Sequence, residues 1–89
     1  MSIYVVAYDL NKETKRPNIV EEVKKIGNWA LLSESSYAIE TNESPSQVMA
    51  RLKKHLDDND NCYVITLSRP WDGWGPKLVI DWLRSKLGS

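Results

Sequence analysis

An aspartate at the end of an apolar stretch is the first side chain of this sequence that could do chemistry. Residues 3–10 are apolar at most positions, and Asp9 stands near their end. A strand of this kind must be covered on both faces. A buried strand that carries a carboxylate to its C-terminal end is one way to position a catalytic group. The carboxylate could equally accept hydrogen bonds from the loop that follows, so both interpretations stay open.

Four other groups of residues are candidates of a different kind. The acidic stretch 57–61 lacks the glycine and the final glutamate of a calcium loop, so we interpret it as a solvated turn. No acid or nucleophile lies at a sequence spacing from His55 that is typical of a catalytic site, so we interpret His55 as a surface residue. Cys62 lies among strand residues, which favours an inert buried thiol. Trp71 and Trp74 could stack on nucleic-acid bases, or pack against the last helix or a dimer partner.

Periodicity and turn signals predict the elements that must position these residues. Pro17 suits the first turn of a helix, and Gly27 is predicted to end that helix as a left-handed cap. Ser44 and Gln47 have the spacing of a capping box at the start of a second helix. The predicted strands are 3–10, 29–32, 36–41 and 62–67, and the predicted helices are 17–26, one that follows Ser44, and 77–87.

This order predicts an α+β fold, a ferredoxin-like βαββαβ domain with an additional C-terminal helix. We expect a single domain over residues 1–89, with a core at 2–68, a Trp-rich loop at 69–76 and the helix at 77–87. The most apolar strands, 3–10 and 62–67, are expected at the centre of the sheet. One sheet face then stays apolar, and either the last helix or a second subunit must cover it. We favour a two-fold dimer to which the last helix contributes.

The charge balance limits the possible partners. The chain has 89 residues with 12 basic and 12 acidic side chains, so its net charge is zero. A protein that binds nucleic acid without regard to sequence is usually basic, so contacts with nucleic acid would need local patches or a metal. No basic-then-apolar leader opens the sequence, and no apolar run reaches the roughly 18 residues of a membrane span. We therefore expect a cytoplasmic protein with no membrane partner.

Several segments resemble a known family. Residues 4–10, followed by the basic Lys12, Lys15 and Arg16, are similar to the opening of the second CRISPR-associated protein, a family of small ferredoxin-like nucleases and adaptors. Residues 32–40 resemble its serine–aromatic segment, and 62–67 resemble its fourth strand. The virulence-associated protein D ribonucleases share this pattern. Those relatives end in a fifth strand, where this sequence has residues 71–76 and a helix, which indicates a relative outside the CRISPR system.

The resemblance implies a site and an activity. It implies that Asp9 from two subunits holds one Mg²⁺ or Mn²⁺ ion, and that the homodimer is a metal-dependent endonuclease acting on RNA or DNA. It also implies which residues contact the nucleic acid. These are three serines near the phosphate, Ser33, Ser35 and Ser36, and the flanking cations Lys12, Lys15 and Arg16.

Two alternatives to cleavage remain. One is a non-catalytic nucleic-acid-binding dimer, whose binding would depend on salt and on the basic residues after Asp9. The other is a protein-interaction or regulatory module that uses the loop containing Trp71 and Trp74. The second alternative requires no affinity for nucleic acid at all.

Overall fold

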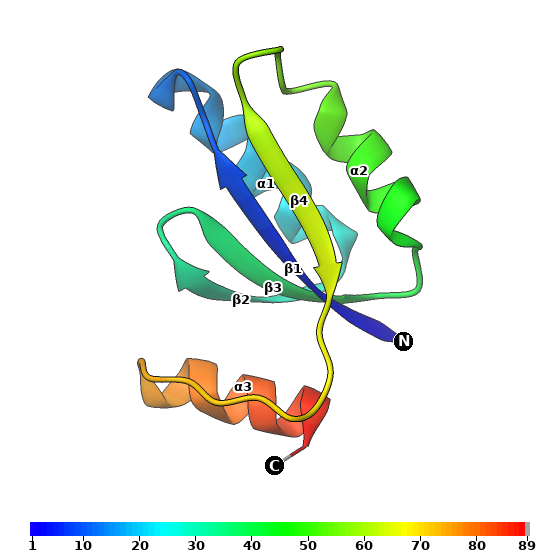
Figure 1. Cartoon of the computed structure of the whole chain (residues 1–89), viewed down its shortest axis with the longest axis vertical. Coiled ribbons are helices and arrows are strands. Elements are labelled where there is room, and N and C mark those ends of the chain that lie inside the picture. Colours follow the sequence, from blue (N-terminus) through cyan, green and yellow to red (C-terminus); the bar gives the residue numbers. More distant parts are fainter. Residues whose placement is uncertain (89) are drawn as a thin grey trace.

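The sheet is built around β1 (Ser2–Asp9), which lies between β3 (Ser36–Thr41) and β4 (Asn61–Thr66). The computed structural model describes residues 1–88, so the last residue of the predicted domain lies outside it. β2 (Asn28–Ser33) completes an antiparallel sheet of order β2-β3-β1-β4. A 3₁₀ turn, η1 (Glu13–Lys15), leads into α1 (Arg16–Ile26). α1 and α2 (Pro45–Lys53) lie behind the sheet in Figure 1, and α3 (Lys77–Leu87) lies apart from them.

The element order confirms the predicted α+β fold, a ferredoxin-like βαββαβ arrangement with an additional C-terminal helix. One detail of the prediction was wrong, because β4 is an edge strand and the second central strand is β3. Although β4 is largely apolar, only one of its faces is covered. Val64 packs on the core, while Tyr63 and Ile65 on the other face are 60% and 55% exposed.

The core lies between the sheet and the first two helices. Alternate residues of β1 point toward the helices, where Tyr4, Val6 and Tyr8 are buried. The two tyrosine hydroxyls donate to backbone oxygens at the rim, Tyr4 to Glu43 at 2.6 Å and Tyr8 to Glu34 at 3.4 Å. The facing helices and β3 contribute a matching apolar layer: Ile19, Val23, Ile26, Tyr37, Ile39, Val48 and Leu52.

The predicted capping box at the start of α2 is confirmed. The Ser44 hydroxyl accepts from the Gln47 N–H at 3.2 Å, and the Gln47 side chain accepts from the Ser44 N–H at 2.7 Å. Because these bonds satisfy N–H groups at the helix start, a cap of this kind contributes about 1 kcal/mol. The short capping sequence alone therefore located the start of this helix.

Gly27 ends α1 in a way that differs from the prediction. Its φ is 174°, which is extended backbone and not the left-handed cap expected from the sequence. The glycine is required by space: a Cβ built on it would lie 2.0 Å from the carbonyl oxygen of Glu40 on β3. The turn into β2 therefore depends on a close backbone approach between segments that are distant in sequence.

α3 covers part of the sheet face that α1 and α2 leave open. It packs against β2, and Lys86 forms an ion pair with Glu40 at 3.0 Å. The sheet residues in this part are small and buried, since Ala30 is 7% and Ala38 0% exposed. Of the two covers predicted for this face, the last helix accounts for part of it, and the second subunit stays a prediction. α3 covers the β2–β3 part, and β4 keeps exposed apolar side chains.

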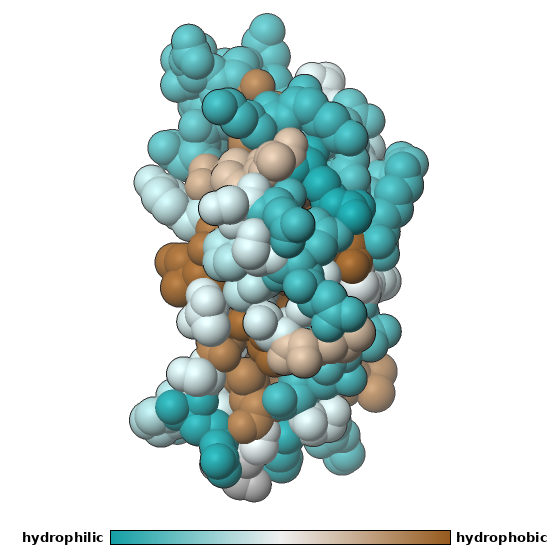
Figure 2. All heavy atoms as spheres, turned by 90° about the vertical axis from the view of Figure 1, so that its right-hand side faces the viewer, coloured by the Kyte–Doolittle hydropathy of each residue, from teal (hydrophilic) through white to brown (hydrophobic). Residues whose placement is uncertain are grey.

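Hydrophobic atoms reach the surface through the middle and lower part of the molecule in Figure 2, whereas its upper part is hydrophilic. The exposed large apolar residues are Met1, Trp29, Leu31, Tyr63, Ile65, Trp74 and Leu78. Among the helices of residues 1–88, none has the length and apolar character that a membrane crossing requires.

Replacing Gly27 with alanine should destabilise the fold by about 2 kcal/mol, because the new methyl group would overlap the Glu40 carbonyl and force the backbone to move. Urea unfolding followed by circular dichroism would measure the change. Gly75→Ala is the matched control, since nothing lies within 4 Å of the position that its new methyl group would take and its φ is not left-handed. Equal unfolding midpoints for the two variants would contradict the steric role of Gly27.

Candidate functional site

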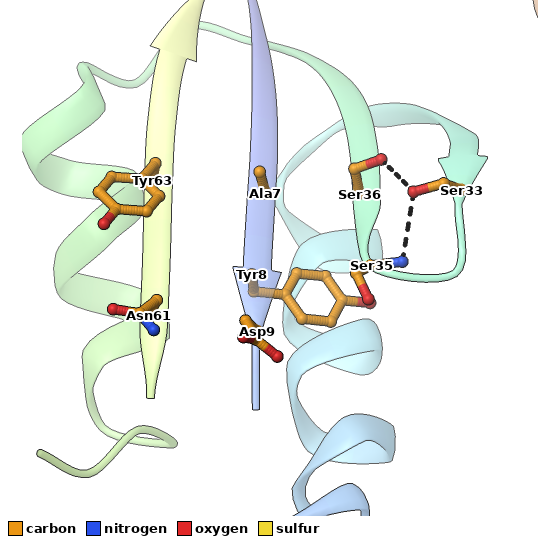
Figure 3. A pocket seen from close by; sticks show the side chains of 8 residues that line it. All are labelled: Ala7, Tyr8, Asp9, Ser33, Ser35, Ser36, Asn61 and Tyr63. Atoms are coloured by element: carbon orange, nitrogen blue, oxygen red, sulfur yellow. Dashed lines mark hydrogen bonds between the residues drawn. The ribbon is translucent and has the colours of Figure 1, made fainter. Parts of the chain in front are cut away.

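A shallow depression of about 370 Å³ lies at the C-terminal end of β1, on the face away from α1 and α2. It is formed by the ends of β1, β3 and β4 and by the hairpin that joins β2 to β3. Figure 3 shows the Asp9 carboxylate between Asn61 of β4 and Ser35 of the hairpin. The lining residues are Ala7, Tyr8, Asp9, Ser33, Ser35, Ser36, Asn61 and Tyr63.

The alternation of β1 brings Asp9 to this depression. Tyr8 points into the core, so the next residue points to the opposite face, where it is exposed. Asp9 is paired with Asn61 across β1 and β4. Among residues 1–88 its carboxylate has no ion pair, and the loop N–H of Asn11 donates instead to Asp60 at 2.7 Å. The alternative interpretation, in which Asp9 accepts hydrogen bonds from the loop, is therefore not supported.

The three predicted serines converge on the same depression. Ser33 and Ser36 share a hydroxyl hydrogen bond of 2.6 Å, and the N–H of Ser35 donates to the Ser33 hydroxyl at 3.4 Å. The backbone N–H of Tyr8 donates to the carbonyl of Ser35 at 2.9 Å, which ties the hairpin to β1. The structure thus places these hydroxyls beside Asp9, although they come from different strands.

Lys15 is engaged in the protein's own structure. Its ammonium group forms ion pairs with Asp57 and with Asp60, the second at 2.7 Å. These hydrogen bonds raise the pKa of Lys15. The contact joins the loop after β1 to the loop before β4. Stretch 57–61 contains the exposed turn that we predicted, and the lysine holds it to the loop after β1. Lys15 is consequently not free to neutralise a phosphate.

Arg16 is engaged in a similar way. Its guanidinium donates to the Glu13 carboxylate at 2.7 and 3.1 Å and to the Glu34 carbonyl, and it lies over the Tyr8 ring at 5.5 Å. The bond to Glu13 raises the pKa of Arg16, while burial raises that of Tyr8. Arg16 thereby attaches the start of α1 to the tip of the β2–β3 hairpin.

The predicted basic group is therefore reduced to one free cation. Lys12 is exposed and has no ion pair among residues 1–88, in contrast to Lys15 and Arg16. The sequence signal that was missed is the set of oxygen atoms that meet those two cations. Glu13 is three residues from Arg16, whereas Glu34, Asp57 and Asp60 are separated from the cations that they contact by 18 to 45 residues.

The donors in the depression are oxygen atoms of the kind that Mg²⁺ and Mn²⁺ prefer. They are one carboxylate, one side-chain amide and the serine hydroxyls. Among residues 1–88 no group of three or more His, Cys, Asp or Glu side chains could hold a metal ion. A single subunit thus supplies one anionic ligand, and a further carboxylate would have to come from a second copy.

The two tryptophans of the loop differ. The Trp71 indole donates to the Gly88 carbonyl at 2.7 Å and is half-buried, so it packs against the end of α3. Trp74 is fully exposed, at 102% of its reference area. The predicted interaction loop therefore presents Trp74, whereas Trp71 holds the loop to the helix.

Two residues outside the depression, His55 and Cys62, are neither fully exposed nor fully buried. His55 was interpreted as a surface histidine, but its ring lies 3.1 Å from buried Glu22, where α1 meets the end of α2. The contacts with His55 and then with Lys54 lower the pKa of Glu22. Cys62 is half-buried as expected of an inert thiol, and burial raises its pKa to about 11.

The acid stability of the protein should depend on Asp60. Its pKa is lowered from 3.8 to about 2, first by Lys15 and then by the N–H groups of Asn11 and Asp57. A carboxyl whose pKa is depressed by folding adds stability above its unfolded pKa, and this contribution is lost as the pH falls through the folded pKa. We expect Asp60→Asn to lower the urea midpoint at neutral pH, with the difference from wild type shrinking as the pH falls from about 4 to about 2.

Asp58→Asn is the matched control, because Asp58 lies in the same loop and has no hydrogen bond or ion pair among residues 1–88. Urea unfolding at a series of pH values would measure both variants. A constant difference between wild type and Asp60→Asn at every pH would contradict the role given to the Lys15–Asp60 ion pair.

The comparisons with known proteins bear on the fold. No family model and no curated protein matches the sequence. Among solved structures, the chain is similar to a hypothetical protein, TT1823 from Thermus thermophilus, with a TM-score of 0.71 and 21% sequence identity. The alignment covers 84% of this chain and 92% of that one. At this identity the similarity shows a shared fold, the ferredoxin-like arrangement described above.

Proposed function

We propose that the protein is a metal-dependent endonuclease that cleaves RNA or DNA as a homodimer in which Asp9 of each subunit contributes to one site. The observation that carries the proposal is the convergence of Asp9 with Ser33, Ser35 and Ser36 in one depression. These residues come from three strands and a hairpin. The proposal includes a relationship to the second CRISPR-associated protein and to virulence-associated protein D, outside the CRISPR system, and a cytoplasmic location.

The residues of the depression fit a hard divalent cation. Two Asp9 carboxylates from a dimer would hold Mg²⁺ or Mn²⁺, and each subunit adds the amide oxygen of Asn61 and serine hydroxyls as neutral oxygen donors. Such a cation, when bound, neutralises charge on the phosphate and lowers the pKa of a coordinated water. The single carboxylate per subunit is the reason that the proposal needs a dimer.

The side chains of the depression have separable tasks in the hydrolysis. A water oxygen forms a bond to phosphorus, and one P–O ester bond breaks. One proton of the water reaches the leaving alcohol and the other is released from the new phosphate monoester. Asp9 is the one carboxylate among the lining residues, so an Asp9 oxygen that does not hold the metal would accept the proton that the attacking water loses. Ser35 and Ser36 can donate hydrogen bonds to the phosphate oxygens and orient the ester.

The charge around the depression favours contact with only a few phosphates of the substrate. Lys15 and Arg16 are neutralised by the protein's own carboxylates, which leaves Lys12 as the free cation of the predicted basic group. Each neutralised phosphate releases counterions and steepens the salt dependence of binding. A site with one free lysine per subunit would therefore bind nucleic acid weakly and would depend on the metal for the reacting phosphate.

The exposed apolar side chains of β4 support the dimer. Tyr63 lines the depression itself, and Ile65 follows it on the same face. Burial of such side chains against a second copy is favourable, at roughly 25 cal/mol per Å² of apolar surface. The same contact would bring the ends of two β1 strands, and hence two Asp9 carboxylates, to one interface.

A second role is favoured by a specific observation. The full exposure of Trp74 suits a protein-interaction surface, the alternative in which the Trp-rich loop binds a partner. This role needs neither Asp9 nor a metal, so it can be separated from cleavage by mutation. It would also explain why the loop is attached firmly to α3 through Trp71 while Trp74 points outward.

Replacing Asp9 with alanine should reduce Mg²⁺- or Mn²⁺-dependent cleavage by roughly 100-fold or more, since metal stabilisation of the transition state is worth several kcal/mol. The assay would use labelled single-stranded and duplex RNA and DNA across a metal series, with the protein prepared by two independent purifications. Asp58→Ala is the control, because it removes an exposed carboxylate outside the depression.

Unchanged cleavage by Asp9→Ala would show that the activity comes from another residue or from a contaminating nuclease. The absence of cleavage by wild-type protein under every metal and substrate condition would reject the proposed function. Circular dichroism of each variant would establish that the fold is retained, so that a loss of activity reports on the site.

A further inference from the structure

The loop before α3 and the first turn of α3 each carry a protruding apolar side chain. Trp74 in the loop is 102% exposed, and Leu78 in the first turn of α3 is 84% exposed. Both belong to a segment that is fixed at its other end, since the Trp71 indole is bonded to Gly88 and the Gly88 N–H donates to the carbonyl of Arg84. Because the loop is already held in place, Trp74 would lose little conformational freedom when a partner buries it.

An apolar hollow lies directly beside this projection. Its volume is about 210 Å³, and it lies between the Trp-rich loop, α3 and the end of β2. The hollow is lined by the half-buried or buried aliphatic side chains of Leu32, Val79, Ile80 and Leu83. Residues 72–76 of the exposed loop, Trp74 among them, line the rest of it. The surface thus combines a projecting indole with a hollow of a size suited to an aromatic side chain.

A two-fold contact uses the same patch on both copies, so that patch must be complementary to itself. A patch with both a projection and a hollow meets this requirement, because the projection of each copy can enter the hollow of the other. We propose that Trp74 of one subunit is inserted into this hollow on a second copy of the chain. The charges at the border agree with this occupant. The patch carries an acidic residue, Asp72, and a basic residue, Lys77, whose side chain is 88% exposed although it pairs with Asp81 at 2.7 Å. A two-fold arrangement can therefore place Asp72 of one copy near Lys77 of the other.

The area of the patch is adequate for a dimer contact. A buried tryptophan contributes roughly 150–250 Å² of its own surface. Two Trp74 side chains, two Leu78 side chains and the two hollows that receive them therefore reach about 1,000 Å², the lower end for a specific interface. Contacts made by neighbouring parts of the two sheets would add to this area.

The proposed contact rests on the proposed function only in that both need a dimer; it assigns the contact to the Trp-rich loop and α3 in place of β4, and its physical argument does not involve the metal. Leu32 lines the hollow, and the next residue, Ser33, lines the depression that contains Asp9. The first turn of α3 lies on the same side of the molecule as the β2–β3 hairpin in Figure 1. A second copy seated on Trp74 would therefore lie nearest the β2 side of the depression, whereas β1 itself ends away from α3 in Figure 1.

Sedimentation equilibrium of the full chain, from micromolar to millimolar concentration, tests the proposal. Wild type should reach twice the mass of one chain, and Trp74→Asp should weaken the association by at least about 30-fold, as expected of an aromatic residue central to an interface. Leu78→Ser should weaken it as well. Leu31→Ser is the matched control, because Leu31 is an exposed leucine on β2 outside the hollow.

A second readout follows Trp74 directly. In protein labelled with 5-fluorotryptophan, the Trp74 resonance is assigned by its absence from Trp74→Phe, and it should shift with protein concentration as the indole leaves water. The other three tryptophan positions should shift less, since Trp71 is already bonded within the chain. The midpoint of this shift should agree with the dissociation constant from sedimentation.

Several results would overturn the inference. These are a wild-type monomer at every concentration, a dimer unaffected by Trp74→Asp, or a dimer lost only when Tyr63 or Ile65 is replaced by serine. A monomer whose Trp74 resonance moves only on addition of phosphatidylglycerol vesicles would assign the patch to a lipid surface and also overturn it. A Trp74-dependent dimer without nuclease activity would support this contact and reject the proposed function, so the two proposals fail separately.

Discussion

The structure depends on one constraint, the alternation of side chains along β1. Tyr4, Val6 and Tyr8 must be buried against α1 and α2, and this burial leaves no freedom in the direction of the remaining residues. A shift of one residue would bury Asp9 in the apolar layer at a cost of several kcal/mol. The position of the carboxylate beside the β2–β3 hairpin is therefore a consequence of how the core is packed.

The parts of the fold that could be predicted from sequence are those with local causes. The capping box at Ser44 and the bounds of the last helix follow from contacts within a few residues, and the structure confirms both. Gly27 and β4 were predicted incorrectly, because their causes are distant. The space at Gly27 is limited by Glu40, and the place of β4 in the sheet is determined by a crossover connection.

The same distinction applies to the candidate site. The place of Asp9 near the end of a strand could be predicted from the apolar stretch before it, whereas the serines were named from the family resemblance. The sequence could not show whether the nearby cations are free or paired. Lys15 and Arg16 look like free basic residues in the sequence, yet each is bonded to carboxylate or carbonyl oxygens from other segments of the chain. Charge counts along a sequence do not show which charges the fold has already paired.

The position of β4 at the edge of the sheet has a consequence for the unfolded and partly folded protein. Residues 61–66, Asn-Cys-Tyr-Val-Ile-Thr, contain no charge, proline or glycine, and within residues 1–88 no strand pairs with their outer side. Uncharged edge segments rich in β-branched and aromatic residues are templates for intermolecular strand addition and fibril formation. A partner strand bound along this edge would also protect the chain from self-aggregation.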